Sequence, residues 1–151
     1  MGEVTVRGEA GTLRTNVRAG AHALVADEPT SVAGGTDLGP GPYDLLLSAL
    51  GACTSMTLLL YAKKKGYPLE RVTVTLKHDR SHAADCVQCE TTSVDLERIE
   101  TVIHLEGALT DEQRDKLLAM AAKCPVHRTL ESKLFLPIRF GLPDASQVPE
   151  V

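Results

Sequence analysis

Apolar positions dominate one long stretch in the first half of the chain. In Leu45–Ala62, 18 consecutive residues carry no charge, and most of them are Leu, Ala or Met, which favour helices. Lys63–Lys65 follow directly, where positive charge suits the end of a helix, and Gly66 is suited to terminate it. Asp44 stands where the helix would start. The pattern predicts one helix, Tyr43–Lys65.

This predicted helix is apolar on nearly all sides, which is typical of a helix buried on most of its surface. Its 18 uncharged residues also reach the lower limit for a membrane span. Small and polar residues inside the run weigh against a span, namely Ser48, Gly51, Thr54, Ser55 and Thr57. A central core helix is the better interpretation. One small sheet and one further helix cannot bury all of the apolar surface of such a helix. A homodimer in which two such helices pack together would bury the rest.

The N-terminal residues show short apolar segments separated by turn residues. Val4–Val6, Leu13–Val17 and His22–Val25 are separated by Gly8–Gly11 and Ala19–Gly20. Such spacing is typical of hairpins, so we predict three strands in a meander, followed by a Pro/Gly-rich loop that leads to the long helix.

Beyond the long helix, alternation returns. Val72–Leu76 alternates apolar and polar residues, the period of a half-buried strand. Ile99–Leu105 and Leu134–Phe140 are predicted as further strands. The polar stretch His78–Ser93 is predicted to be a loop.

A second helix is predicted to start at Thr110. Gln113 follows three residues later, which is the pattern of a capping box. The helix is expected to reach Cys124 before Pro125 interrupts it, and Leu130 is assigned to a further helical turn. The predicted order βββ–α–ββ–α–β indicates an α+β fold with sheet packed against helices. The length of the chain suits one domain, residues 1–151, with a polar tail from residue 143.

Composition narrows the class of protein. The net charge of −4 and the pI near 5.7 argue against nucleic acid as a partner. No basic segment followed by an apolar one opens the chain, so no signal peptide is expected. Cysteine is too sparse for a disulfide scaffold. We therefore expect a cytoplasmic protein whose four cysteines are chemical or metal-binding groups: Cys53, Cys86, Cys89 and Cys124.

Cys53 and Cys124 each have a plain structural interpretation. Cys53 lies inside the predicted helix among apolar neighbours, where a free cysteine often serves as a small hydrophobe. Cys124 lies at a predicted helix end. Sequence spacing leaves open whether the two meet.

Two motifs with these cysteines, GPGPYDLLLSALGAC and AAKCPVHRTLES, resemble those of the OsmC/Ohr family of thiol-dependent peroxidases, as does the order of the elements around them. The resemblance implies an intertwined homodimer, with antiparallel sheets wrapped around two long central helices and an active site at the subunit interface. It also implies that a cysteine pair reduces organic hydroperoxides or hydrogen peroxide.

By this resemblance Cys53 is the peroxidatic cysteine and Cys124 the resolving one. Thiolate is the attacking species, and it needs positive surroundings or hydrogen-bond donors. Cys124, expected at the C-terminal end of its helix, would face the negative end of the dipole, which suits a thiol that reacts second. Cys53 lies about ten residues into its helix, so the dipole cannot activate it and an arginine is needed.

The family implies that this arginine comes from the N-terminal strands and pairs with an acid near the start of the long helix. Arg14 is the best candidate, with Arg18 and Arg7 behind it; each could equally be a solvated strand residue. Tyr43 stands where the organic-hydroperoxide-resistance branch carries its acid, which places the chain nearer the OsmC-like branch. Asp44, the next residue, could orient the arginine or simply satisfy the helix start.

A second group of metal-ligand residues falls in the predicted loop. The spacing H-x3-H-x3-C-x2-C is formed by His78, His82, Cys86 and Cys89. C-x2-C near histidine is a zinc-ligand spacing, although four ligands so close together are unusual because zinc sites draw from separate elements. A redox C-x2-C and plain loop cysteines are the alternatives.

The leading hypothesis is a cytoplasmic thiol peroxidase that requires no cofactor. Its expected partners are a second copy of the chain, a peroxide, and a lipoyl or thioredoxin-like dithiol reductant, with no nucleic acid and no membrane. Leu46, Leu50 and Met56 could line a pocket for the organic group, core packing being the alternative. The competing hypothesis is a non-catalytic OsmC-like module that binds a small ligand or zinc.

Overall fold

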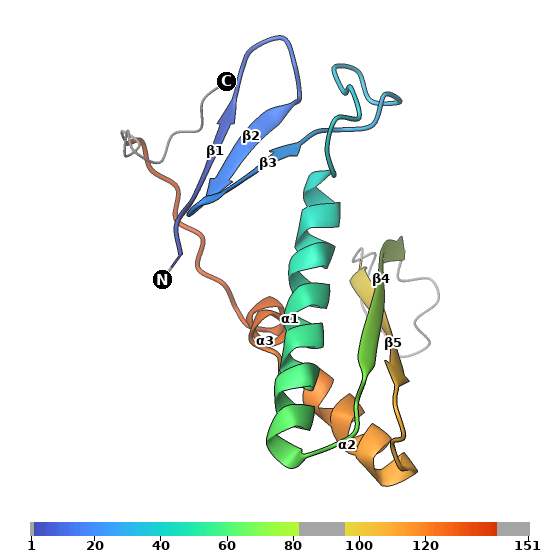
Figure 1. Ribbon diagram of the computed structural model, residues 1–151. Helices are drawn as coiled ribbons and strands as arrows, with labels where there is room; N and C mark the ends of the chain where they lie inside the picture. The colour runs from blue at the N-terminus through green and yellow to red at the C-terminus, as the bar shows by residue number, and fades with distance from the viewer. Residues whose placement is uncertain (1, 82–95, 142–151) are drawn as a thin grey trace, which may run out of the picture. The chain divides into compact units, whose positions relative to one another are not determined.

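The computed structural model describes residues 2–81 and 96–141 (Figure 1). The chain divides into two compact units. The first unit is Met1–Leu46 with Phe135–Val151, and the second unit is Leu47–Leu134. Each is described by itself. The predicted single domain stays a prediction, and the predicted tail from residue 143 lies outside the described residues.

The first unit contains the predicted meander. Strands β1 (Val4–Gly8), β2 (Thr15–Ala19) and β3 (His22–Ala26) form one antiparallel sheet in the order β1-β2-β3. Gly20, between β2 and β3, has φ 61°, as a two-residue hairpin turn requires. Short apolar segments and the turn residues between them therefore predicted this sheet correctly.

Asp27 organises the loop that follows β3. This residue is 2% exposed. Its carboxylate accepts hydrogen bonds from the Thr36 hydroxyl at 2.5 Å and from the backbone N–H groups of Glu28, Thr36 and Leu38 at 2.8, 3.2 and 3.2 Å. The Thr36 hydroxyl is the main cause that holds the pKa of Asp27 below its ordinary value; burial opposes it, and the N–H donors add to it. An ionised Asp27 thus fixes the chain just before the long helix.

The long helix is confirmed, with its start one residue earlier than predicted. Helix α1 spans Pro42–Lys65, and Gly66 at φ 67° ends it. Its length and apolar composition would also allow it to cross a membrane, a property that core helices share. The prediction that this helix is buried on most sides is wrong for the single chain. Only one stripe of α1 is buried: Leu50, Gly51, Thr54, Leu58 and Ala62. Met56 and Leu60, off that stripe, are 62% and 68% exposed.

The second unit packs α1 against a two-stranded antiparallel sheet. Strand β4 (Arg71–Ser81) pairs with β5 (Leu96–Glu106), both longer than predicted. Residues 78–81, predicted to lie in a loop, belong to β4, because the ladder continues past the apolar alternation that marks its first half. A Cβ at Gly51 would lie 2.7 Å from the Leu76 side chain, so this glycine sets the close approach of α1 to β4.

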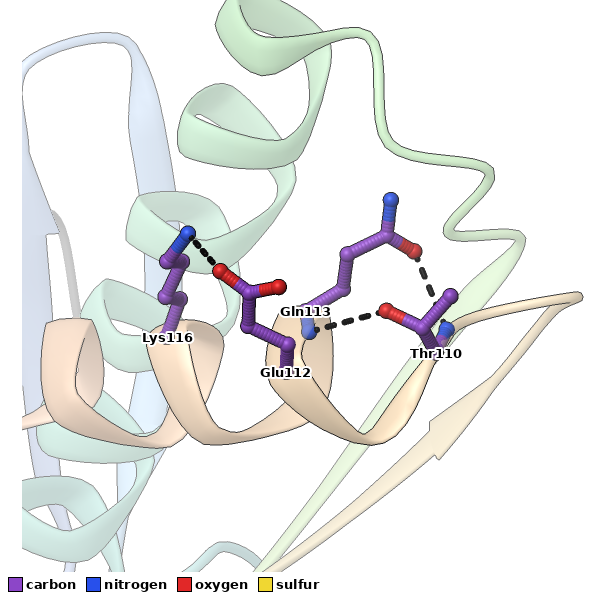
Figure 2. A network of polar contacts seen from close by, with 4 residues as sticks. All are labelled: Thr110, Glu112, Gln113 and Lys116. Carbon is purple, nitrogen blue, oxygen red and sulfur yellow. Dashed lines mark hydrogen bonds and ion pairs between the residues drawn. The ribbon is translucent and has the colours of Figure 1, made fainter.

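Helix α2 (Asp111–Ala121) begins with the predicted capping box (Figure 2). The Gln113 N–H donates to the Thr110 hydroxyl at 3.2 Å, and the Thr110 N–H donates to the Gln113 side-chain oxygen at 3.1 Å. The helix packs Leu117 and Ala121 into a core with Leu58 and Ala62 of α1.

The predicted extension of this helix to Cys124 is wrong. Helix α2 ends at Ala121, the chain turns, and a separate helix α3 runs from Pro125 to Glu131. Proline at the first position of a helix loses no hydrogen bond there, so Pro125 starts α3 instead of interrupting α2. The helical assignment of Leu130 is confirmed.

The predicted strand Leu134–Phe140 is also wrong for the single chain. These residues form no strand, and Phe135, Ile138 and Phe140 are 88%, 96% and 107% exposed. A strand needs a neighbour to satisfy its backbone, and none of the described residues pairs with this segment. Within residues 2–81 and 96–141 the observed order is therefore βββ–α–ββ–α–α.

Candidate functional site

Cys53 and Cys124 meet in the second unit. Cys53 lies halfway along α1 and is partly buried, whereas Cys124 lies directly before α3 and is fully buried. The Cys53 thiol lies near enough to the Cys124 sulfur to lower the pKa of Cys124 by hydrogen bonding, and both cysteines are free. The two thiols predicted to react with each other are therefore neighbours, with Cys53 the more accessible one.

Three further donors converge on the Cys124 sulfur. Cys124 is the N-cap of α3, and its Sγ accepts the His127 N–H at 3.3 Å. The Thr54 hydroxyl of α1 donates from 3.5 Å, and the Val126 N–H adds a further bond. The expected position of Cys124 at the negative end of a helix dipole is thus wrong, because the residue begins α3 and does not end α2.

These contacts determine the acidity of Cys124. Burial raises the pKa of the thiol, but the hydrogen bonds from His127, Thr54, Cys53 and Val126 together outweigh it. The pKa of Cys124 therefore lies below its ordinary value. A thiolate at this position is stabilised, which is the opposite of the electrostatic expectation from sequence.

A cavity of about 190 Å³ lies in the second unit, lined in part by two residues that contact Cys124. Thr54 and His127, which both contact the Cys124 sulfur, contribute to its wall. Thr101 is the other polar residue, and the remaining lining is apolar: Ile103, Leu118, Ala121 and Ala122. The predicted pocket residues Leu46, Leu50 and Met56 are absent from this lining.

Sequence reasoning missed Thr54 and His127. A signal for His127 was present. Proline is common at the first position of a helix, so Pro125 could have indicated that a new helix begins there, with Cys124 before it and His127 in its first turn. No signal existed for Thr54, because its contact with Cys124 joins positions far apart in the chain.

The candidate arginines lie in the first unit. Arg14 precedes β2 and is exposed, and Arg7 forms an ion pair with Glu9 at 3.8 Å. Arg18 lies in β2 and is partly buried. Its buried Nε has no hydrogen-bond partner within residues 2–81 and 96–141. A buried guanidinium nitrogen without a partner is unusual in a folded protein, and Arg18 stays a candidate beside Arg14.

Asp44 accepts a hydrogen bond from the Gly41 N–H at 3.0 Å, at the start of α1. This contact matches the helix-start interpretation. Within the described part of the chain, no arginine forms an ion pair with Asp44. Its role in orienting an arginine stays a prediction.

The predicted metal group falls mostly outside the described residues. His78 lies in β4, where its Nε2 pairs with the Glu97 carboxylate on β5. His82, Cys86 and Cys89 lie between residues 81 and 96 and are not described. The described residues contain no cluster of three or more potential metal ligands. The zinc site stays a prediction.

A sequence model of the OsmC-like protein family matches residues 34–137. The chain belongs to the OsmC-like family. The match includes both Cys53 and Cys124, so the pair lies within the family's shared region in this OsmC-like protein. A comparison with curated proteins found no match.

Solved structures share its fold. An OsmC-like protein from Mycoplasma pneumoniae is 21% identical, with 87% of each chain covered and a TM-score of 0.69. The organic hydroperoxide resistance protein OsmC of Legionella pneumophila is 19% identical, covers 87% of this chain and 89% of its own, and has a TM-score of 0.62. OhrB of Bacillus subtilis, an organic hydroperoxide resistance protein, is 18% identical, with 87% and 90% covered and a TM-score of 0.56. These likenesses confirm the predicted α+β fold with antiparallel sheets.

Proposed function

We propose that this OsmC-like protein is a thiol-dependent peroxidase that reduces organic hydroperoxides or hydrogen peroxide through Cys53 and Cys124. The closeness of the two sulfurs is the observation that carries the proposal, since the Cys53 thiol lies near enough to Cys124 to lower its pKa. Family membership and the names of two similar structures, both organic hydroperoxide resistance proteins, support the substrate class.

The chemistry begins at Cys53, the more accessible sulfur. Cys53 first loses its thiol proton. The thiolate then attacks one oxygen of the peroxide, the O–O bond breaks, and the departing oxygen leaves as an alcohol, or as water, after taking up a proton. Cys53 keeps the transferred oxygen as a sulfenic acid. The Cys124 thiolate then attacks the Cys53 sulfur, and the S–O bond breaks. Hydroxide leaves, becomes water on protonation, and a Cys53–Cys124 disulfide remains.

An external dithiol completes the cycle. Two thiol–disulfide exchanges return both cysteines to the reduced state and leave the dithiol as a disulfide. Lipoyl or thioredoxin-like dithiols are the proposed reductants, no further cofactor is required, and the proposed location is the reducing cytoplasm.

The Cys53 thiolate needs a cation for its activation. We assign this role to an arginine of the N-terminal strands, Arg14 or Arg18. Arg18 is the better candidate on the structure because its buried Nε has no partner within the described ranges.

The proposed assembly is a homodimer. Met56 and Leu60 leave an apolar surface of α1 exposed, and the apolar residues of segment 134–140 are exposed as well. Exposed apolar surface on this scale marks an interaction site. A second copy would cover the helix face and give the segment a strand neighbour. Analytical ultracentrifugation tests this: a monomer at micromolar concentration would contradict the assignment.

Thiol counting tests the peroxidase reaction. In a Cys86→Ser/Cys89→Ser background only Cys53 and Cys124 remain to react. Reduced protein mixed with cumene hydroperoxide should lose both thiols, whereas adding Cys53→Ser should stop the peroxide-dependent loss. Adding Cys124→Ser should leave a sulfenic acid that dimedone traps. If parent and Cys53→Ser variant respond alike, the cysteines are structural and the non-catalytic module is the better description.

A further inference from the structure

Thr54 makes an unusual contact for a threonine inside a helix. It follows Cys53 in α1, is 2% exposed, and its hydroxyl reaches the Cys124 sulfur at 3.5 Å. Threonine in a helix interior commonly donates to the carbonyl four residues earlier. Thr57 does so on the same helix, where its hydroxyl donates to the Cys53 carbonyl at 2.8 Å. The Thr54 hydroxyl is directed instead at a sulfur on another element.

We propose that Thr54 is a positioning residue for disulfide formation: its hydroxyl holds the Cys124 sulfur ionised and in place beside Cys53. The role in disulfide formation rests on the proposed function. The effect of Thr54 on the ionisation of Cys124 does not depend on that reaction.

The need for such a donor follows from the surroundings of Cys124. The residue has no exposed surface, and burial alone disfavours a thiolate. Two of its donors, the N–H groups of Val126 and His127, belong to the backbone. The third is the Cys53 thiol, whose S–H is gone once Cys53 has become a sulfenic acid. Thr54 is therefore the side-chain donor, within the described part of the chain, that persists when Cys124 must attack.

The first experiment follows ionisation of Cys124 with no peroxide present. In a Cys53→Ala/Cys86→Ser/Cys89→Ser background Cys124 is the one remaining thiol, and thiolate absorbance at 240 nm reports its titration. Thr54→Val keeps the branched shape but removes the hydroxyl. We expect its midpoint to rise by about one pH unit, a tenfold loss of thiolate at fixed pH. Thr54→Ser should restore the parent midpoint, and Thr57→Val should leave it unchanged.

A titration of Thr54→Val that overlays the parent curve would overturn the proposal. Circular dichroism verifies that each variant folds; Thr54→Ala supplies the same comparison if the valine variant does not.

The second experiment separates the two steps of the proposed cycle. With Cys53 restored, Thr54→Val should form the sulfenic acid at the parent rate but close the disulfide about tenfold more slowly, so that dimedone traps more of it. Unchanged closure would refute the positioning role. If the parent itself forms no sulfenic acid, the peroxidase proposal fails, whereas the titration still judges the contact between Thr54 and Cys124.

Discussion

The His127 backbone N–H donates to the Cys124 sulfur at 3.3 Å, which makes Cys124 the N-cap of α3. A sulfur in this position satisfies a helix N–H that would otherwise lack a partner. It also receives the stabilisation that helix starts give to negative charge. Together with the other hydrogen bonds to this sulfur, the contact reverses the electrostatic role that the sequence suggested for Cys124.

The lowered pKa of Cys124 predicts a pH-dependent contribution to stability. A thiol whose pKa is lower folded than unfolded binds more protons in the unfolded state, so stability rises with pH between the two values. The contribution should be complete above the unfolded pKa of about 8.5 and lost as pH falls through the folded value. Urea unfolding of reduced protein should therefore show that the stability difference between parent and Cys124→Ala grows from pH 6 to pH 9. A difference that is constant across this range would contradict a stabilised thiolate.

Removing the activating arginine should slow reaction with peroxide. Loss of one preorganised charged group typically costs about a hundredfold in rate. We expect Arg18→Ala to lower the second-order rate of Cys53 oxidation by about that factor, whereas Arg14→Ala lowers it less. Stopped-flow peroxide consumption at fixed pH measures both. The reverse order would assign the role to Arg14. Wild-type rates in both variants would exclude both arginines from the activation of Cys53.

The capping box at α2 should contribute measurably to stability. Thr110→Ala removes the hydroxyl that accepts the Gln113 N–H, and loss of an N-cap typically costs about 1 kcal/mol. Thr110→Ser keeps an accepting oxygen and is the matched control. Urea denaturation should place the alanine variant clearly below both serine variant and parent. Coincident curves would show that the hydrogen bonds between Thr110 and Gln113 in Figure 2 contribute nothing to stability.

The predicted zinc site has a direct assay. If His78, His82, Cys86 and Cys89 bind zinc, elemental analysis should find one equivalent per chain, because these residues supply one four-ligand set. Cys86→Ser/Cys89→Ser should then abolish it, whereas Cys53→Ser should retain it. Purified protein without stoichiometric metal would remove the hypothesis. His78 already pairs with Glu97. A metal bound by His78 would either displace the Glu97 carboxylate or leave it as a hydrogen-bond partner of the histidine ring.

The sequence by itself determined the features that are written within a few neighbouring residues. Short apolar segments and turn residues specified the three-stranded meander, the uncharged run Leu45–Ala62 specified α1, and Thr110 with Gln113 specified the start of α2. These signals are local because helix capping, hairpin turns and side-chain periodicity involve groups close together in the chain.

Only the tertiary structure decided what surrounds the sulfurs. It placed the Cys53 thiol and the Thr54 hydroxyl of α1 against Cys124, and it left the apolar segment 134–140 without a strand neighbour in the single chain. Acidity of a buried thiol depends on its burial and on donors contributed by distant segments, and strand formation depends on a partner. Local residue spacing determines neither the acidity of the thiol nor the formation of the strand, so both depended on the folded chain.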